Sequence, residues 1–245
     1  MPLAFVLVAV AGAVIAVGSL AAMRAGGAQP AVARRLAGPP EVRVGELLDA
    51  AVLPDRPVRV VGRVRCRDPL VTADDERLVA FHRDVEVKAG GRWRSVERMR
   101  ETRSFDLWDH DGSLSVDPAR AADPLITIPK VWRGEPAVLE EPHASAVAGL
   151  AERHGPATAA RSIVRTLDST DRLLVVARPV RDDEGRVRLE PPSGGYVISN
   201  LALPDAMRVL GGRHRRLAAL GVIGVAAGVA LVAVGLIGAV VATAL

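Results

Sequence analysis

The pattern of apolar residues divides the chain into two uncharged ends and a charged middle. Residues 3–23 and 217–245 contain no charged side chain. A helix rises about 1.5 Å per residue, so roughly 20 apolar residues suffice to cross a bilayer core. A helix buried in a globular core would keep a polar face, and the second segment has none. The pattern therefore predicts transmembrane helices at 3–23 and 217–245.

The first segment leaves two interpretations open. Only Met1 and Pro2 precede its apolar run, whereas a signal peptide begins with a positive region and has a shorter apolar core. Ser19-Leu20-Ala21 would nevertheless serve as a cleavage site. We expect an uncleaved anchor, with cleavage as the alternative.

Charge near the segment ends predicts the orientation. Positive residues gather on the inner side of both segments: Arg24, Arg34, Arg35, Arg208, Arg213, Arg215 and Arg216. The positive-inside rule then places the middle domain in the cytoplasm and both termini outside. The abundance of Ala, Gly, Val, Pro and Arg, with only two Lys, is typical of a GC-rich bacterial genome. We therefore expect a two-pass protein of the bacterial inner membrane.

Small residues recur at four-residue spacing in both segments, at Gly12 and Ala16 and at Gly224 and Gly228. Such faces let helix backbones approach closely. The two segments could pack on each other, or two copies of the chain could associate through Gly224 and Gly228.

The middle of the chain reads as a linker, 24–41, followed by a β-rich domain, 42–212. Alternating β-branched and polar residues predict strands, and turn residues at 88–91, 109–112 and 181–185 predict hairpins between them. The predicted strands are 57–65, 78–87, 92–97, 105–107, 114–116, 125–128, 172–180, 186–190 and 195–199, and the predicted helices are 44–51, 143–153 and 201–210. The fold class is α+β: a mostly antiparallel soluble β domain flanked by two transmembrane helices.

Three places carry side chains of a reactive type. Cys66 is the only cysteine, which excludes an internal disulfide and a cysteine-based zinc site, and we expect it at a strand end. His82 lies within a predicted strand with no visible catalytic partner. Asp109, His110 and Asp111 resemble metal ligands, but adjacent residues of a tight turn rarely converge on one ion. We expect no catalytic, cofactor-binding or metal-binding residue and no cofactor.

Several function classes lack their motifs. The sequence contains no Gly-x-Ser-x-Gly or His-Glu-x-x-His motif, and Gly194-Gly195 is too short for a P-loop and lacks its Lys. A channel or transporter subunit would carry intramembrane charge, which both segments lack. Nucleic-acid binding is not expected, because the net charge is +4, Arg is interspersed with Asp and Glu, and aromatic residues make up 3%.

The order of short motifs resembles a known family. The matching residues are Val61-Gly62-Arg63-Val64, Pro69-Leu70, Val79 to Val85, Trp93, Phe105-Asp106-Leu107, Asp111-Gly112, Val116-Asp117, Leu189 to Pro192 and Tyr196 to Ser199. This order is similar to that of the GIDE, or "beside a membrane" (BAM), domain of the MULAN-like membrane-embedded E3 ubiquitin ligases and their prokaryotic relatives. The resemblance covers roughly Val42 to Leu245.

The resemblance implies a GIDE-like domain held between two spans. In the ligases a zinc-binding RING finger follows the second span, whereas this sequence has one cysteine, so zinc and ubiquitin transfer cannot be carried over to any residue. We expect a membrane-tethered, non-catalytic module that binds an unknown protein partner. The alternative is a membrane-bound enzyme of the MULAN-like family.

Overall fold

In this computed structural model the described residues are 2–24, 29–211 and 214–244. They form two compact units. The first unit joins the two ends of the chain, Met1–Arg34 and Leu210–Leu245, and the second comprises Arg35–Val209. Each unit is described by itself.

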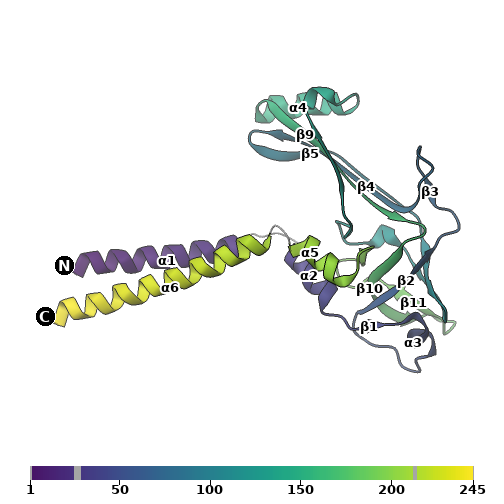
Figure 1. Ribbon diagram of the computed structural model, residues 1–245, viewed down its shortest axis with the longest axis horizontal. Coiled ribbons are helices and arrows are strands. Elements are labelled where there is room, and N and C mark those ends of the chain that lie inside the picture. Colours follow the sequence, from purple (N-terminus) through teal and green to yellow (C-terminus); the bar gives the residue numbers. More distant parts are fainter. Residues whose placement is uncertain (1, 25–28, 212–213, 245) are drawn as a thin grey trace. The chain divides into compact units, whose positions relative to one another are not determined.

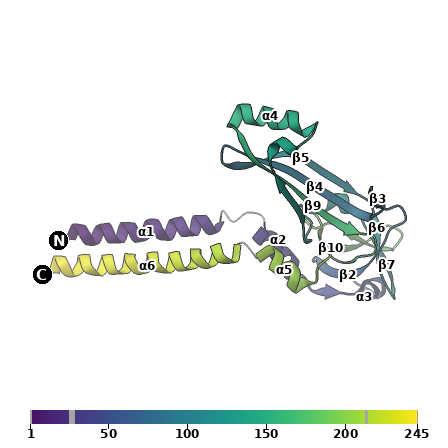
Figure 2. The ribbon, with the colours of Figure 1, turned by 45° about the horizontal axis from the view of Figure 1, so that its top comes forward.

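The first unit contains two long helices, α1 (Pro2–Arg24) and α6 (His214–Ala244), which lie side by side (Figures 1 and 2). Glycine makes the close approach possible. A Cβ added at Gly12 would lie 2.6 Å from the Gly228 carbonyl oxygen, and one added at Gly228 would lie 2.9 Å from the Ala16 Cβ. The small residues thus pack within one chain. Association of two copies through Gly224 and Gly228 stays a prediction.

The predicted membrane spans are corrected by the structure. Within the described residues, no helix provides a run that is both long and apolar enough to cross a membrane. This finding overturns the transmembrane helices 3–23 and 217–245, and with them the two-pass inner-membrane location of the chain.

The predicted linker, 24–41, contains ordered elements. Helix α2 (Gln29–Ala37) and strand β1 (Glu41–Val42) both fall in it. The Ala, Gly and Pro content suggested a flexible segment, but Ala, Leu and Arg are good helix formers, and Pro30 occupies the first turn, where proline is tolerated. Leu36 of this helix is fully buried, so packing fixes its last turn.

The second unit is α+β with mostly antiparallel strands, as predicted. Its first sheet has the central order β11-β10-β2-β6-β7; β1 pairs with β2 in parallel, and β12 pairs with β10. The strands are β2 (Val58–Arg65), β6 (Phe105–Asp109), β7 (Gly112–Val116), β10 (Arg172–Arg181), β11 (Val187–Glu190) and β12 (Val197–Ser199). In the sequence, helix α3 (Val44–Asp49) lies between β1 and β2, and helix α5 (Leu203–Gly211) follows β12.

The second sheet is built on three long strands. Its order is β5-β4-β9-β8, and β3 pairs with the first residues of β4. The strands are β3 (Leu70–Val71), β4 (Arg77–Ala89), β5 (Arg92–Thr102), β8 (Lys130–Gly134) and β9 (Ala157–Asp168). Short 3-10 helices η1 (Pro118–Arg120) and η2 (Pro136–Val138) precede and follow β8. Helix α4 (His143–His154) packs near the β4–β5 turn (Figure 2).

One hydrophobic core joins the two sheets. Val79 and Ala80 of β4 and Leu167 of β9 are buried with residues of the first sheet, including Leu107 and Leu173. The charged parts of β4 and β9 extend beyond this core. The second sheet is therefore anchored at one end and presents charged side chains further along.

A glycine turn closes the core beside Tyr196, whose hydroxyl donates to the Leu189 carbonyl at 2.7 Å. Gly195 has φ +86°, and a Cβ there would lie 2.6 Å from the Arg120 carbonyl oxygen. We expect Gly195→Ala to lower the free energy of unfolding by about 3 kcal/mol, because backbone strain and a backbone clash add. Gly185→Ala is the matched control.

Gly185 has φ +78° but no neighbour within 4 Å of a built Cβ. Its replacement should therefore cost only the strain, about 1 kcal/mol. Urea unfolding of both variants measures the difference. Equal losses would show that the Gly195 site relaxes to accept a methyl group.

Candidate functional site

Cross-strand pairing gathers charged side chains on one face of the second sheet. His82 of β4 pairs with Arg100 of β5 on one side and with Arg165 of β9 on the other. Asp84 follows two residues later and, because strand side chains alternate, lies on the same face. We call this group, with Asp123 and Arg98, the Asp84 cluster.

Asp84 is the centre of that cluster. The Nη2 of Arg100 donates to its Oδ1 at 2.6 Å, and the Nη1 of Arg165 donates to its Oδ2 at 3.3 Å. The Nε of Arg98 lies 3.5 Å from Oδ1. The Asp84 side chain is only 15% exposed, so these contacts are shielded from water more than surface ion pairs are.

Asp123 reaches the same cluster from the segment that follows η1. Its two carboxylate oxygens accept from Arg100 Nη2 at 3.2 and 3.0 Å. Burial acts to raise the pKa of Asp123, but the hydrogen bonds and charge of Arg100 outweigh it, and the pKa is lowered. Burial likewise acts to lower the pKa of Arg100, and hydrogen bonds to Asp123 and Asp84 raise it. Both groups are therefore held in their charged forms.

His82 is the group of the cluster with a potential for proton transfer. It is 5% exposed, and its Nδ1 lies 3.7 Å from Oδ1 of Asp123 without a hydrogen-bond partner in the described part of the chain. Burial, followed by the charge of Arg100, lowers its pKa to about 4. The imidazole is therefore neutral at pH 7. A buried, neutral ring surrounded by paired charges is poorly placed to meet a substrate.

Further along the same face a second set of charges is more open. The Nε of Arg161 donates to Oε2 of Glu86 at 2.6 Å, and its guanidinium lies 4.1 Å from the ring centroid of Trp93. Arg133 of β8 stands directly opposite Arg161 in the strand register. Arg133 is exposed, and no ion pair of its side chain occurs among the described residues. The result is a pair of adjacent guanidinium groups.

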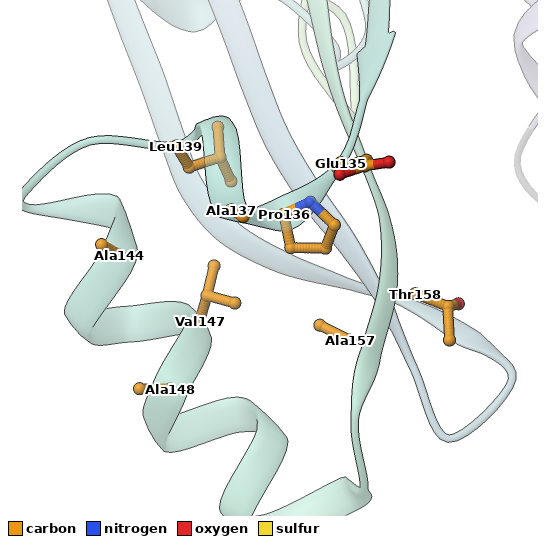
Figure 3. Close-up of a pocket in the computed structure, with 9 residues that line it drawn as sticks. All are labelled: Glu135, Pro136, Ala137, Leu139, Ala144, Val147, Ala148, Ala157 and Thr158. Atoms are coloured by element: carbon orange, nitrogen blue, oxygen red, sulfur yellow. The ribbon is translucent and has the colours of Figure 1, made fainter.

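The opposite face of this sheet meets α4. His143 Nε2 lies 3.1 Å from Oε2 of Glu97, and Arg83 Nε lies 3.9 Å from the same oxygen. A shallow groove of about 570 Å³ opens beside them between η2, α4 and the start of β9. Figure 3 shows Val147, Pro136 and Ala157 around it, with Glu135 at its edge. Its lining is mainly apolar and offers few groups for chemistry.

The residues singled out from the sequence do not converge. Asp109 accepts from the Val44 and Asp111 backbone N–H groups, at 3.2 and 2.9 Å, so its oxygens organise the predicted β6–β7 turn. Cys66 follows the last residue of β2, and its thiol donates to the Ser104 carbonyl at 3.5 Å. Across residues 2–24, 29–211 and 214–244, no group of three or more His, Cys, Asp or Glu side chains is placed to hold a metal ion.

Sequence reasoning missed the Asp84 cluster. It considered His82 alone, whereas the partners come from β5, β9 and the segment after η1. The signal for the cluster was an arginine opposite His82 on each neighbouring strand. It could be recognised only once the strand pairing was known.

The comparisons with known proteins give no family. No protein-family model, curated protein or solved structure matches this chain.

Proposed function

We propose that the β-rich unit is a non-catalytic interaction module that binds a protein partner, as the resemblance to GIDE domains implies. The observation that carries the proposal is the open second sheet. Strand β8 pairs only with β9, and β5 pairs only with β4, so each has a free edge in the described part of the chain. Free strand edges bind extended segments of other chains unless they are covered.

The placement of the family-like motifs supports the same proposal. Val61 to Val64 lie in β2, Val79 to Val85 in β4, and Leu189 and Glu190 at the end of β11. Residues of all three segments contribute to one core, and Val61, Gly62 and Arg63 also line a small cavity of about 260 Å³. The motifs therefore maintain the fold, which is compatible with a binding domain that has no catalytic residues.

The enzyme alternative has one candidate centre, the Asp84 cluster. Its carboxylates are paired with arginines, and its one imidazole is buried. A general acid or base must come within hydrogen-bond reach of the substrate. The cluster satisfies its own charges instead, which favours a structural role.

A photo-crosslinking experiment tests the interaction module. A photoreactive amino acid is placed in the full chain at position 98 on β5, at 132 on β8, or at 186 in the β10–β11 turn as control. We expect a discrete adduct in cells from 98 or 132 and none from 186. Absence of an adduct at both edges, or ester, phosphate or peptide hydrolysis that is lost in His82→Gln, would refute the module.

A further inference from the structure

We propose that the free edge of β8 binds an extended acidic segment of a protein partner by strand addition. This inference rests on the proposed interaction module and names its surface and ligand. The recognised sequence has acidic residues on both sides of two apolar residues. The pattern follows from the order Lys130-Val131-Trp132-Arg133 along the edge.

The outer edge of β8 has backbone groups without a strand partner in the described part of the chain. Its five residues pair with Ala160 to Val164 of β9, and the described backbone hydrogen bonds connect it to no other strand. In an antiparallel edge strand, alternate residues direct their N–H and C=O groups outward. An extended peptide can satisfy those groups, whereas a nucleic acid has no such backbone.

Exposed apolar side chains lie at the same edge. Val131 is 41% and Trp132 42% exposed, and Ile128, just before the strand, is 73% exposed. Proteins often protect an edge with charge, a short strand or proline. Lys130 and Arg133 fit that protective role, but exposed valine and tryptophan between them do not. Apolar residues contiguous with a free edge mark a docking surface.

The charge along β8 favours an acidic ligand. Arg133 stands opposite Arg161 in register, and like charges in directly opposed positions destabilise a sheet. Arg161 is held in place by Glu86 and by the Trp93 ring. Because Arg161 is already paired with Glu86, Arg133 is the guanidinium of the two without a carboxylate partner in the described part of the chain, and a carboxylate from an added strand would lie opposite it.

The side-chain alternation fixes the recognised pattern. Val131 and Arg133 share one face of the sheet, and Lys130 and Trp132 share the other. A partner strand therefore needs an acid opposite Arg133 and apolar residues opposite Trp132 and Val131. An acid opposite Lys130 would share an ammonium group that already lies 3.2 Å from Oε1 of Glu76. The pattern acid–apolar–apolar–acid is the same in both directions, so it does not depend on whether the partner strand is parallel or antiparallel to β8.

Fluorescence anisotropy with a labelled peptide tests the inference on the full chain. The probe contains Glu-Val-Val-Glu flanked by serines, and the matched control contains Lys-Val-Val-Lys. We expect binding of the acidic probe only, and at least a tenfold weaker affinity for Arg133→Glu, which corresponds to about 1.4 kcal/mol. Trp132→Ala should also weaken binding, and Arg186→Glu, in the exposed β10–β11 turn, should not.

Two further probes can overturn the inference. A peptide N-methylated at both valines keeps its charge but loses the N–H group that faces β8, so equal binding would exclude strand addition. Displacement of the probe by a single-stranded oligonucleotide of equal charge would indicate a general polyanion surface instead. If crosslinking from position 98 or 132 succeeds and the acidic peptide does not bind, this inference fails while the interaction module stands. If neither edge crosslinks, the module itself fails.

Discussion

Replacing Asp84 by alanine is expected to lower the free energy of unfolding by about 3 kcal/mol. Removing one partner of a buried ion pair typically costs 3–5 kcal/mol, and the partial exposure of this cluster places the effect at the lower end. Arg100 and Arg165, with side chains 23% and 18% exposed, would keep their charges without the central carboxylate. Urea unfolding followed by far-UV circular dichroism measures the loss.

Two companion variants make the Asp84 result specific. Asp84→Asn keeps an acceptor oxygen for one arginine and should lose less than Asp84→Ala. Glu190→Ala removes a carboxylate that also binds two arginines, Arg178 and Arg188, but the side chains of these arginines are 51% and 57% exposed. Surface pairs contribute little, so that variant should change stability far less. Equal losses at the two positions would mean that the Asp84 cluster does not behave as a shielded network.

The hairpins of the β-rich unit were predictable from the sequence because their signals are local. The turn predicted at 88–91 joins β4 to β5, Asp109 and Gly112 flank the β6–β7 turn, and the turn at 181–185 joins β10 to β11. Helix α4, predicted at 143–153, is observed at His143–His154. Alternating residues and turn residues carry this information within about ten positions.

Strands β8 and β9 were missed, because little in their sequences marks them. The sequence of β9 begins with small residues and places arginines among its β-branched ones, and β8 has only five residues. The prediction instead placed a short strand at 125–128, where the structure has a single bridge between Ile126 and Ser199. Partners about 80 positions apart, such as His82 and Arg165, become neighbours only through this pairing. The Asp84 cluster was therefore invisible to local patterns.

The apolar ends show the opposite difficulty. Their uncharged runs were long enough to predict bilayer spans, yet among the described residues no helix is long and apolar enough to cross a membrane. The small residues within them were the more informative signal, since Gly12 and Gly228 bring α1 and α6 into backbone contact. The spacing had left two alternatives open, packing of the two segments on each other and association of two copies, while apolar character alone did not establish what surrounds the helices.

The pH dependence of stability provides the second large effect, and His82 is its source. An unfolded histidine binds a proton near pH 6.5, whereas in the folded protein burial and the charge of Arg100 lower the His82 pKa to about 4. Asp123 and Asp84 oppose that shift, and Arg165 adds to it. Protonation below pH 6.5 therefore favours the unfolded state. The contribution of His82 is fully present above pH 6.5 and is lost as the pH falls to about 4.

The expected loss is about 3 kcal/mol over that window, from about 1.4 kcal/mol for each unit of pKa difference. Urea unfolding at pH 7.5, 5.5 and 4.5 measures it as the difference between the unmodified chain and His82→Gln, which cannot titrate. The unmodified chain should lose more stability than His82→Gln as the pH falls. His110→Gln, at an exposed turn position, is the matched control. Parallel curves for the unmodified chain and His82→Gln would show that the imidazole of His82 is accessible to protons in the folded state, and would reopen a role for it in proton transfer.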